Sequence, residues 1–202
     1  MPINAQTYFN ALRSHLNTDY YEVTEVEGGR IVLKDKIYPP NSPIQIEQRV
    51  RLEVPGEALV INLDRKKPRT NSCERLFHFL DDNAKPWSRR CDYVIFHLHR
   101  QRVSAFCIEF KSATFPDSLV DQLKASAAWC RSLHSIIKHY TNETKRLFLT
   151  KYVLSCHPNP APYLDADGRY LQRDYSIRHY LYADIDGMSL DALDNANVET
   201  IN

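Results

Sequence analysis

The sequence is poor in glycine, has no excess charge of either sign and contains no long apolar run. Only 5 of its 202 residues are glycine and 43% are hydrophobic, so fibrous and disordered classes are excluded. The formal net charge is +1, and any binding to nucleic acid must therefore come from local patches. Because no apolar run reaches about 18 residues, we expect no membrane-spanning helix and no membrane partner.

Cysteine is also used sparingly. The five cysteines are odd in number and form no C-x-x-C pair, and two lie within apolar strand patterns, where a free thiol behaves as a small hydrophobe. The first residues, Met1 to Asn4, lack the basic and apolar regions of a secretion signal. These features together predict a cytoplasmic protein with reduced cysteines and a single domain large enough to bury a core.

The amino-terminal part, residues 1–70, is predicted to be a helix followed by a β extension. Asn4 can cap a helix whose apolar residues recur at Tyr8, Leu12 and Leu16. Alternating segments then follow around the turn at Gly28-Gly29, and the pattern predicts an antiparallel sheet with one solvated face. Its expected strands cover residues 21–26, 30–33, 44–52 and 58–63.

Residues 71–202 are predicted to form the core, with elements of both kinds. A short helix over 73–82, capped by Asn71 or Ser72, precedes two apolar strands and a long helix from Pro116 or Asp117 to about Tyr140. A mostly apolar, internal strand follows over 145–156. The remaining expected elements are strands at 90–96, 103–111, 169–173 and 178–185 and a final short helix near Leu190. The fold class is a mixed α/β sheet flanked by helices.

The two strands at 90–96 and 103–111 carry the strongest chemical pattern. If Arg100-Gln101 is a two-residue turn, residues whose numbers sum to 201 face each other, so Asp92 lies opposite Glu109. Lys111 shares their face, two residues further on. Two buried carboxylates at about 5 Å repel each other unless a cation lies between them, and Mg²⁺ or Mn²⁺ with carboxylate and water ligands suits this arrangement.

These residues resemble a family pattern. Asp92, seventeen residues before Glu109-Phe110-Lys111, followed by a helix carrying Gln122, resembles the PD-(D/E)xK superfamily of restriction-endonuclease-like nucleases. The resemblance covers roughly residues 72–154 and implies the restriction-endonuclease-like form of the mixed sheet. One departure is that Asp92 follows Cys91, where the motif commonly has proline.

The resemblance implies roles for individual residues. Asp92 and Glu109 would bind Mg²⁺, and Lys111 would assist the attacking water. Glu74 could match a glutamate that many members carry on the preceding helix, as a further metal ligand, and Gln122 could match a catalytic-site glutamine found on the following helix in some members. The sequence shows no clear strand between Glu74 and Asp92, where the usual core has one.

Basic residues near this pattern are candidates for contacts with phosphate. Arg65 and Lys67 belong to a basic loop, and Arg89 and Arg90 precede the first strand of the pattern. Each group is also explained as an ordinary solvated connection or as strand-end charge. His97, two residues from His99, is expected on the face opposite Asp92, and structural histidines explain this pair better than a metal site.

Three readings of the sequence follow. The leading one is a Mg²⁺-dependent nuclease that acts on DNA, in phage defence or DNA processing. In that reading the amino-terminal strands serve to form a homodimer or to select the substrate. The second is the same fold without catalysis, acting as a binding or assembly subunit of a larger complex. The third is an unrelated α/β protein with a chance E-x-K, which predicts that Asp92 and Glu109 are far apart.

Overall fold

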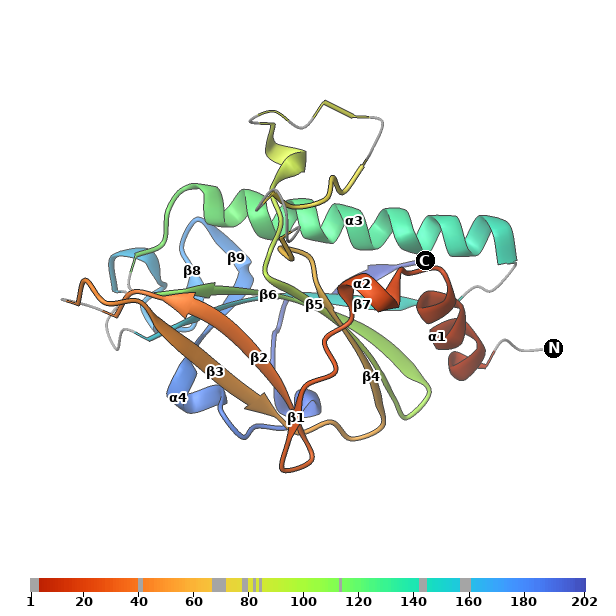
Figure 1. Ribbon diagram of the computed structural model, residues 1–202, viewed down its shortest axis with the longest axis horizontal. Coiled ribbons are helices and arrows are strands. Elements are labelled where there is room, and N and C mark those ends of the chain that lie inside the picture. Colours follow the sequence, from red (N-terminus) through yellow and green to blue (C-terminus); the bar gives the residue numbers. More distant parts are fainter. Residues whose placement is uncertain are drawn as a thin grey trace.

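The computed structural model describes residues 4–39, 42–66, 72–77, 80–81, 83, 85–112, 114–141, 145–156 and 161–202. Their centre is a mixed sheet of seven strands with the long helix α3 across one face, and a smaller sheet of three antiparallel strands lies apart from it (Figure 1). The predicted fold class, a mixed α/β sheet with an amino-terminal antiparallel extension, is confirmed.

The described elements follow the chain in this order: α1 (Ala5–Ser14), α2 (Thr18–Tyr21), β1 (Val26–Glu27), β2 (Arg30–Ile37), β3 (Ile46–Leu52), β4 (Glu57–Asn62), η1 (Pro86–Ser88), β5 (Tyr93–His99), β6 (Arg102–Lys111), α3 (Ser118–Thr141), β7 (Leu147–Ser155), η2 (Ala161–Tyr163), β8 (Tyr170–Leu171), β9 (Asp174–Leu181), α4 (Tyr182–Ile185), η3 (Leu190–Ala192) and β10 (Glu199–Ile201).

The first helix forms as its sequence predicts. The Asn4 side chain accepts a hydrogen bond from the Gln6 amide at 3.1 Å, which satisfies one of the free amides at the helix start. Its apolar stripe is buried against the core. The Tyr8 hydroxyl lies 2.5 Å from Nδ1 of His134 on α3, so a buried polar contact fixes the two helices together.

The smaller sheet has the order β1-β2-β3. Its predicted turn at Gly28-Gly29 is confirmed, with φ of +59° and +79°, values that favour glycine. Two details differ from expectation. Residues 18–21 are helical, so only Val26 and Glu27 pair with β2. The strand expected at 58–63 is β4, which pairs with β5 in the central sheet.

The central sheet is ordered β4-β5-β6-β7-β9-β8, and β10 also pairs with β7. Strands β4, β5 and β6 are antiparallel neighbours, whereas β7 and β9 run parallel to β6. A parallel pair needs a crossover, and α3 supplies it between β6 and β7. The predicted long helix and the internal strand at 145–156 are thus confirmed as α3 and β7.

Two local expectations are wrong. The helix expected over 73–82 is absent from its described residues, which form bends and a bridge between Lys66 and Cys73. In that segment the Glu74 carbonyl accepts a hydrogen bond from the Arg90 guanidinium. In a helix, the same carbonyl would accept from a backbone amide four residues later. The strand expected over 178–185 ends at Leu181, and the chain turns into α4 there. The short final helix expected near Leu190 is confirmed as the 3₁₀ helix η3.

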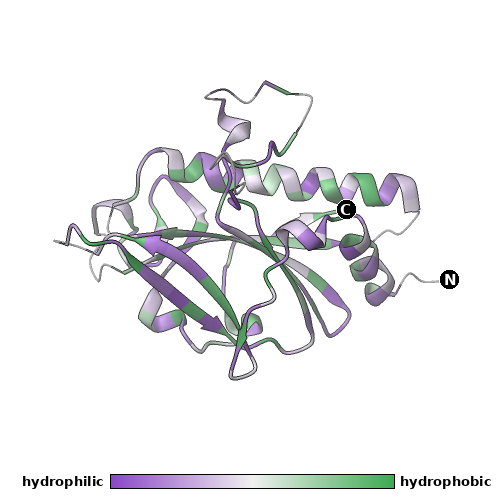
Figure 2. Cartoon of the chain, viewed as in Figure 1, coloured by the Kyte–Doolittle hydropathy of each residue, from purple (hydrophilic) through white to green (hydrophobic). Residues whose placement is uncertain are grey.

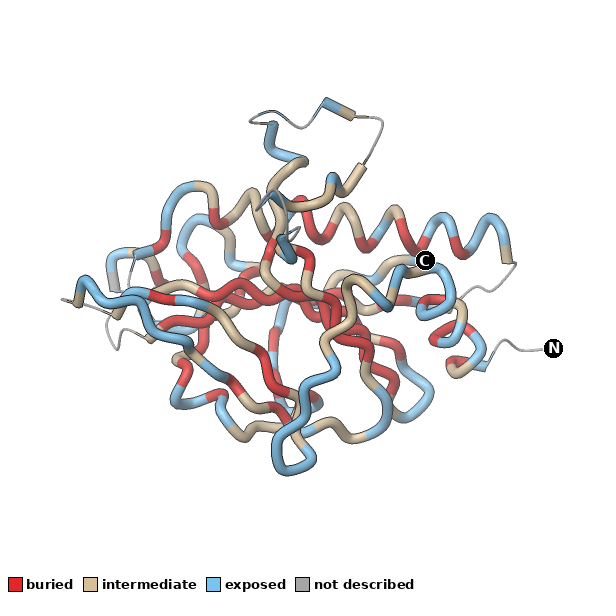
Figure 3. The backbone as a smooth tube through the Cα atoms, in the orientation of Figure 1, coloured by how far each residue is buried: buried red, intermediate tan, exposed pale blue. Residues whose placement is uncertain are grey.

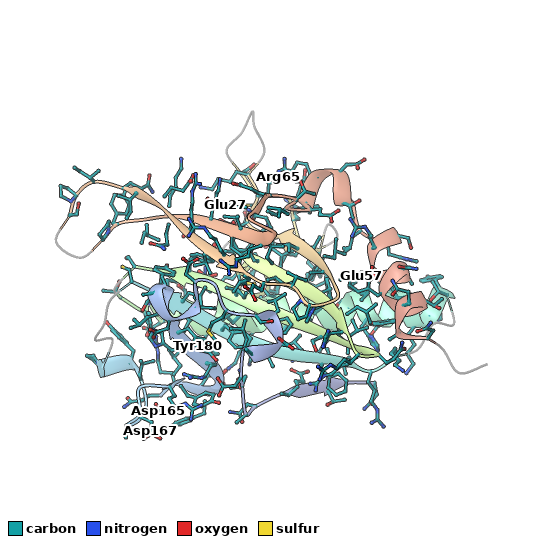
Figure 4. All side chains as sticks on the ribbon, turned by 90° about the horizontal axis from the view of Figure 1, so that it is seen from below. Glu27, Glu57, Arg65, Asp165, Asp167 and Tyr180 are labelled. Atoms are coloured by element: carbon teal, nitrogen blue, oxygen red, sulfur yellow. The ribbon has the colours of Figure 1, made fainter. Side chains whose placement is uncertain are left out.

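Two apolar clusters fill the molecule. One lies between the central sheet and the helices α1 and α3, and the other lies between the opposite sheet face, β2–β3 and the segment around α4. Figures 2 and 3 show apolar and buried residues concentrated in the central strands, and Figure 4 shows side chains filling the space beneath the smaller sheet. Within the described residues, no helix combines the length and apolarity required to cross a bilayer.

Candidate metal centre at the ends of β5 and β6

The turn between β5 and β6 has the predicted length. Arg100 and Gln101 have φ of +46° and +62°, the positive values that a two-residue turn of the I′ type requires at both central positions. The strand pairs run from His99 opposite Arg102 to Tyr93 opposite Ile108. The predicted register, in which paired numbers sum to 201, is therefore confirmed.

Asp92 lies one residue before β5 and is thereby placed opposite Glu109. One hydrogen bond joins the two residues directly, because the Asp92 amide donates to Oε2 of Glu109 at 3.1 Å. A second bond ties Asp92 to the residue after Glu109, since the Phe110 amide donates to Oδ2 of Asp92 at 2.6 Å. Nζ of Lys111 donates to Oε1 of Glu109. The expectation of the chance-motif reading, that Asp92 and Glu109 are far apart, is therefore wrong.

The chain around Asp92 is held by β4 on one side and α3 on the other. The Leu63 amide, just after β4, donates to the Asp92 carbonyl at 3.0 Å. From α3, the Ser126 hydroxyl accepts from the Cys91 amide at 2.7 Å, and the Gln122 side chain donates to the Arg90 carbonyl at 3.3 Å. The aspartate is thus positioned by hydrogen bonds to its neighbours along the chain.

Gln122 has a second feature. Its Oε1 is buried and, among the described residues, has no hydrogen-bond partner. A buried acceptor without a donor costs free energy, on the order of 1–3 kcal/mol, so this oxygen is suited to a donor from water or a ligand. The glutamine that the family resemblance singled out is therefore close to the aspartate segment and has an acceptor free to use.

Burial dominates the electrostatics of the two acids. Glu109 is 1% exposed, and burial raises the pKa of its carboxyl to about 7, although the adjacent Lys111 opposes the shift. The pKa of Asp92 is raised well above its usual value, first by burial and then by the negative charges of Glu109 and Asp35. A cation bound by these carboxyls would lower both pKa values, because positive charge favours the ionised form.

Two further acids influence this centre, and the sequence reading missed both. Asp35 on β2 raises the pKa of Asp92, and Asp64, just after β4, raises the pKa of Glu109. Asp35 had a signal in the sequence, because it occupies the inward face of β2 between the buried residues Leu33 and Ile37. An acid at a core-facing strand position marks a site that needs a partner. Asp64 had no comparable signal.

Glu74 occupies a different environment. The helix that was expected to carry it is absent, and its carbonyl is bound to Arg90. Its carboxyl charge raises the pKa of Tyr21, whereas the main charges acting on Asp92 and Glu109 belong to other residues. Its assignment as a metal ligand stays a prediction.

The candidate phosphate-binding residues are partly engaged within the chain. Arg65 donates to the Tyr20 carbonyl and lies over the Tyr20 ring, 5.0 Å from its centroid. Arg90 donates to two carbonyls of its own loop region. Arg89 lies 3.8 Å from Asp121, a loose and solvent-exposed ion pair. Lys67 is outside the described residues. Contacts of these residues with nucleic acid stay predictions.

Asp92 and Glu109 offer hard oxygen donors for a divalent cation. Within the described ranges, no three His, Cys, Asp or Glu side chains come together as a ready-made metal cluster. Mg²⁺, however, is often held by one or two carboxylates, with water completing its shell. The donors present, two carboxylates with raised pKa values, fit such an ion.

Comparisons of the chain with models of protein families, with curated proteins and with solved structures gave no match.

Proposed function

We propose that this chain is a metal-dependent nuclease of the restriction-endonuclease-like PD-(D/E)xK class, with DNA as its substrate. One observation carries the proposal: Asp92 lies opposite Glu109 at the ends of two adjacent strands and donates its amide to the Glu109 carboxyl, which also accepts from Lys111. An acid pair can hold a divalent cation and a neighbouring lysine can place positive charge at a phosphate, and metal-assisted phosphodiester hydrolysis can use both.

Asp92 and Glu109 would hold Mg²⁺ or Mn²⁺ through their carboxylate oxygens. When bound, the ion lowers the pKa of a coordinated water and screens the charge of a phosphate. Lys111 is positioned by its ion pair with Glu109, and its ammonium would orient the nucleophilic water or stabilise negative charge on the phosphate oxygens. Gln122 is the acceptor on α3 that could bind the same water.

The arrangement of elements supports the class. In the superfamily, a strand separates the glutamate-bearing helix from the aspartate-bearing strand, and here β4 pairs with β5 in that place. Of the two helices before β4, α1 contains no acidic residue and α2 contains Asp19. Asp35 on β2 is the acid whose charge acts on Asp92, and it would influence a bound cation through that charge and not as a third member of a ligand cluster among the described residues.

Cleavage of DNA tests the proposal directly. Plasmid and single-stranded DNA are incubated with the protein and Mg²⁺ or Mn²⁺, and wild type is compared with Asp92→Asn and Lys111→Ala. We expect each substitution to lower the cleavage rate by at least about 100-fold, because each removes a metal ligand or a charge that acts in the transition state.

Lys36→Ala is the matched control. Lys36 is exposed on the smaller sheet, and its removal should leave the cleavage rate unchanged. Cleavage that persists in both site variants would contradict the proposal, as would the absence of cleavage by wild type with either ion.

A non-catalytic module is the second candidate function. The observation in its favour is that Lys111 already balances the charge of Glu109, so the centre has an internal counter-ion. Calorimetric titration with Mn²⁺ separates the two. Saturable binding that is lost in Asp92→Asn supports the nuclease, whereas a folded protein that binds DNA or a protein partner but no Mn²⁺ supports the module.

A further inference from the structure

A cavity of about 710 Å³ lies at the other end of the β5–β6 hairpin, next to its turn. Even-numbered residues of β6 and β7 form its floor, because Phe106 and Tyr152 belong to the apolar cluster on the sheet face opposite α3. The segment 190–198 closes the other side. Along β6 the cavity extends from Arg102 to Phe106, which are seven and three residues from Glu109, so it lies roughly 10–23 Å from the acid pair at about 3.3 Å per residue.

The wall of this cavity contains buried polar atoms that have no hydrogen-bond partner among the described residues. Thr150 is 7% exposed, and its hydroxyl lies near that of Tyr152 but forms no hydrogen bond of ordinary geometry in the described part of the chain. Nε2 of His99 is also buried without a bond, and its nearest acid, Asp191, is 3.9 Å away. A buried polar atom without a partner in a native fold indicates that water or a ligand forms the missing hydrogen bond.

His97 adds a defined acceptor. It is 3% exposed, and its Nε2 lies 2.7 Å from the Pro55 carbonyl. A carbonyl can only accept, so Nε2 carries the proton and Nδ1 is left as an acceptor in the neutral ring. The rings of His97 and His99 are stacked at 5.8 Å. The cavity therefore presents a hydroxyl and two imidazoles beside an apolar floor.

Positive charge lies at the mouth. Arg100 and Arg102 are exposed, line the cavity and, within the described residues, have no acidic partner. The Arg102 guanidinium lies over the Phe148 ring at 3.9 Å, an arrangement that leaves its edge free to bind an anion.

The acids of the same cavity are engaged elsewhere. Asp194 is bound to Arg169 at 2.7 Å and to the Tyr180 hydroxyl, and Asp191 accepts from the Ser189 hydroxyl at 2.5 Å. Arg169 thus balances Asp194, and Arg100 and Arg102 outnumber the remaining carboxylate of the lining, Asp191.

We propose that this cavity is a binding site for a nucleoside monophosphate. Its volume is within the range of small-molecule sites, roughly 300–1,000 Å³. The base would lie against the aromatic floor, with its polar edge on Thr150 and the histidines, and the phosphate would bind Arg100 and Arg102. The assignment is independent of the proposed nuclease activity, because it uses different residues on the other sheet face.

Isothermal titration of the full chain with the monophosphates of adenosine, guanosine, cytidine and uridine tests the assignment. We expect saturable binding of at least one, and weaker binding of inorganic phosphate and of the matching nucleoside, because each lacks half of the contacts. Arg102→Ala and Thr150→Val should each weaken the binding by about tenfold or more, and combining Arg100→Ala with Arg102→Ala should weaken it further.

Arg49→Ala is the matched control, since Arg49 is exposed on the smaller sheet and should not affect the affinity. Circular dichroism of each variant confirms its folding. The assignment is overturned if none of the four nucleotides binds to the folded wild type, or if the cavity variants bind as well as Arg49→Ala. Equal affinities for inorganic phosphate and the nucleotide would also overturn it, because the base would then contribute nothing.

Discussion

The two ends of strand β6 place charged groups in opposite surroundings. At the Glu109 end, the buried Glu109 lies opposite the half-buried Asp92 on the neighbouring strand, and the pKa values of both carboxyls are raised. At the Arg102 end, guanidinium groups remain exposed and the carboxyls of the neighbouring loop are neutralised by arginine or bound by hydroxyls. At the Glu109 end, the ionised form of the carboxyls is unfavourable. At the Arg102 end, buried polar atoms of His99 and Thr150 have no hydrogen-bond partner among the described residues.

The difference teaches how one hairpin can support two kinds of site. Side chains alternate between sheet faces, so Glu109 and Lys111 face one way and Arg102 and Phe106 the other. The acid end is covered by α3, which excludes water from the carboxyls, whereas the turn end faces a loop segment that leaves a cavity. The raised pKa of Glu109 and the cavity near Arg102 both depend on which elements pack against the two faces of β6.

The largest expected effect concerns the acid end and pH. The pKa of Glu109 rises from its usual 4.5 to about 7 in the folded protein, so the folded state holds the proton more tightly. The associated stability is complete below about pH 4.5 and is lost as the pH rises through about 7. Relative to wild type, Glu109→Gln should therefore gain up to about 3 kcal/mol of unfolding free energy between pH 4 and pH 8.

Urea unfolding at a series of pH values measures this gain, with the exposed Glu57→Gln as control. Addition of Mn²⁺ at pH 8 should stabilise wild type and not Glu109→Gln. If the two variants and wild type show parallel pH profiles, the raised pKa of Glu109 is wrong and the contrast between the two ends of β6 disappears.

A medium effect concerns the support of Asp92 by α3. Ser126→Ala removes the acceptor of the Cys91 amide and leaves that buried donor without a partner, so we expect a loss of about 2 kcal/mol in unfolding free energy. Ser132→Ala is the matched control on the same helix. Its hydroxyl is half-buried and bonded only to its own helix, so we expect a change within about 0.5 kcal/mol. Equal losses in urea unfolding would show that α3 does not hold the aspartate segment.

The smallest effect concerns the turn end. Gln101 has φ of +62°, a conformation that is unfavourable for residues with a Cβ. Gln101→Gly should therefore raise the unfolding free energy by about 1 kcal/mol, a rise in Tm of about 2–4 °C for a chain of this size. Gln101→Ala keeps the Cβ and should leave Tm nearly unchanged. A decrease in Tm for the glycine variant would indicate that the Gln101 side chain makes a contact that outweighs the strain.

Local patterns predicted the elements whose burial follows a simple period. The helix capped by Asn4, α3 and β7 have apolar residues at the spacing of the element that formed, and the turn at Gly28-Gly29 followed from its glycine pair. The register of β5 and β6 was predictable as well, because the turn length fixes which residues face each other. The juxtaposition of Asp92 and Glu109 followed from that single count.

The elements that failed are those decided by distant groups. Residues 73–82 have a helical pattern of apolar residues, yet the Glu74 carbonyl is bound by Arg90, sixteen residues away in sequence. The apolar pattern after Tyr180 continues as a strand would, but the chain bends at Tyr182, whose hydroxyl donates to the Lys111 carbonyl at 2.7 Å. Sequence spacing carries no information about such partners.

By itself, the sequence determined the pairing of Asp92 with Glu109 and the place of Lys111, since strand alternation and one tight turn are local properties. Only the tertiary structure decided that β4 lies beside β5, that Asp35 from the smaller sheet acts on this centre, and that a cavity lies at the opposite end of β6. The physical reason is that pKa shifts and cavities depend on which surfaces cover a residue, and those surfaces come from segments far away along the chain.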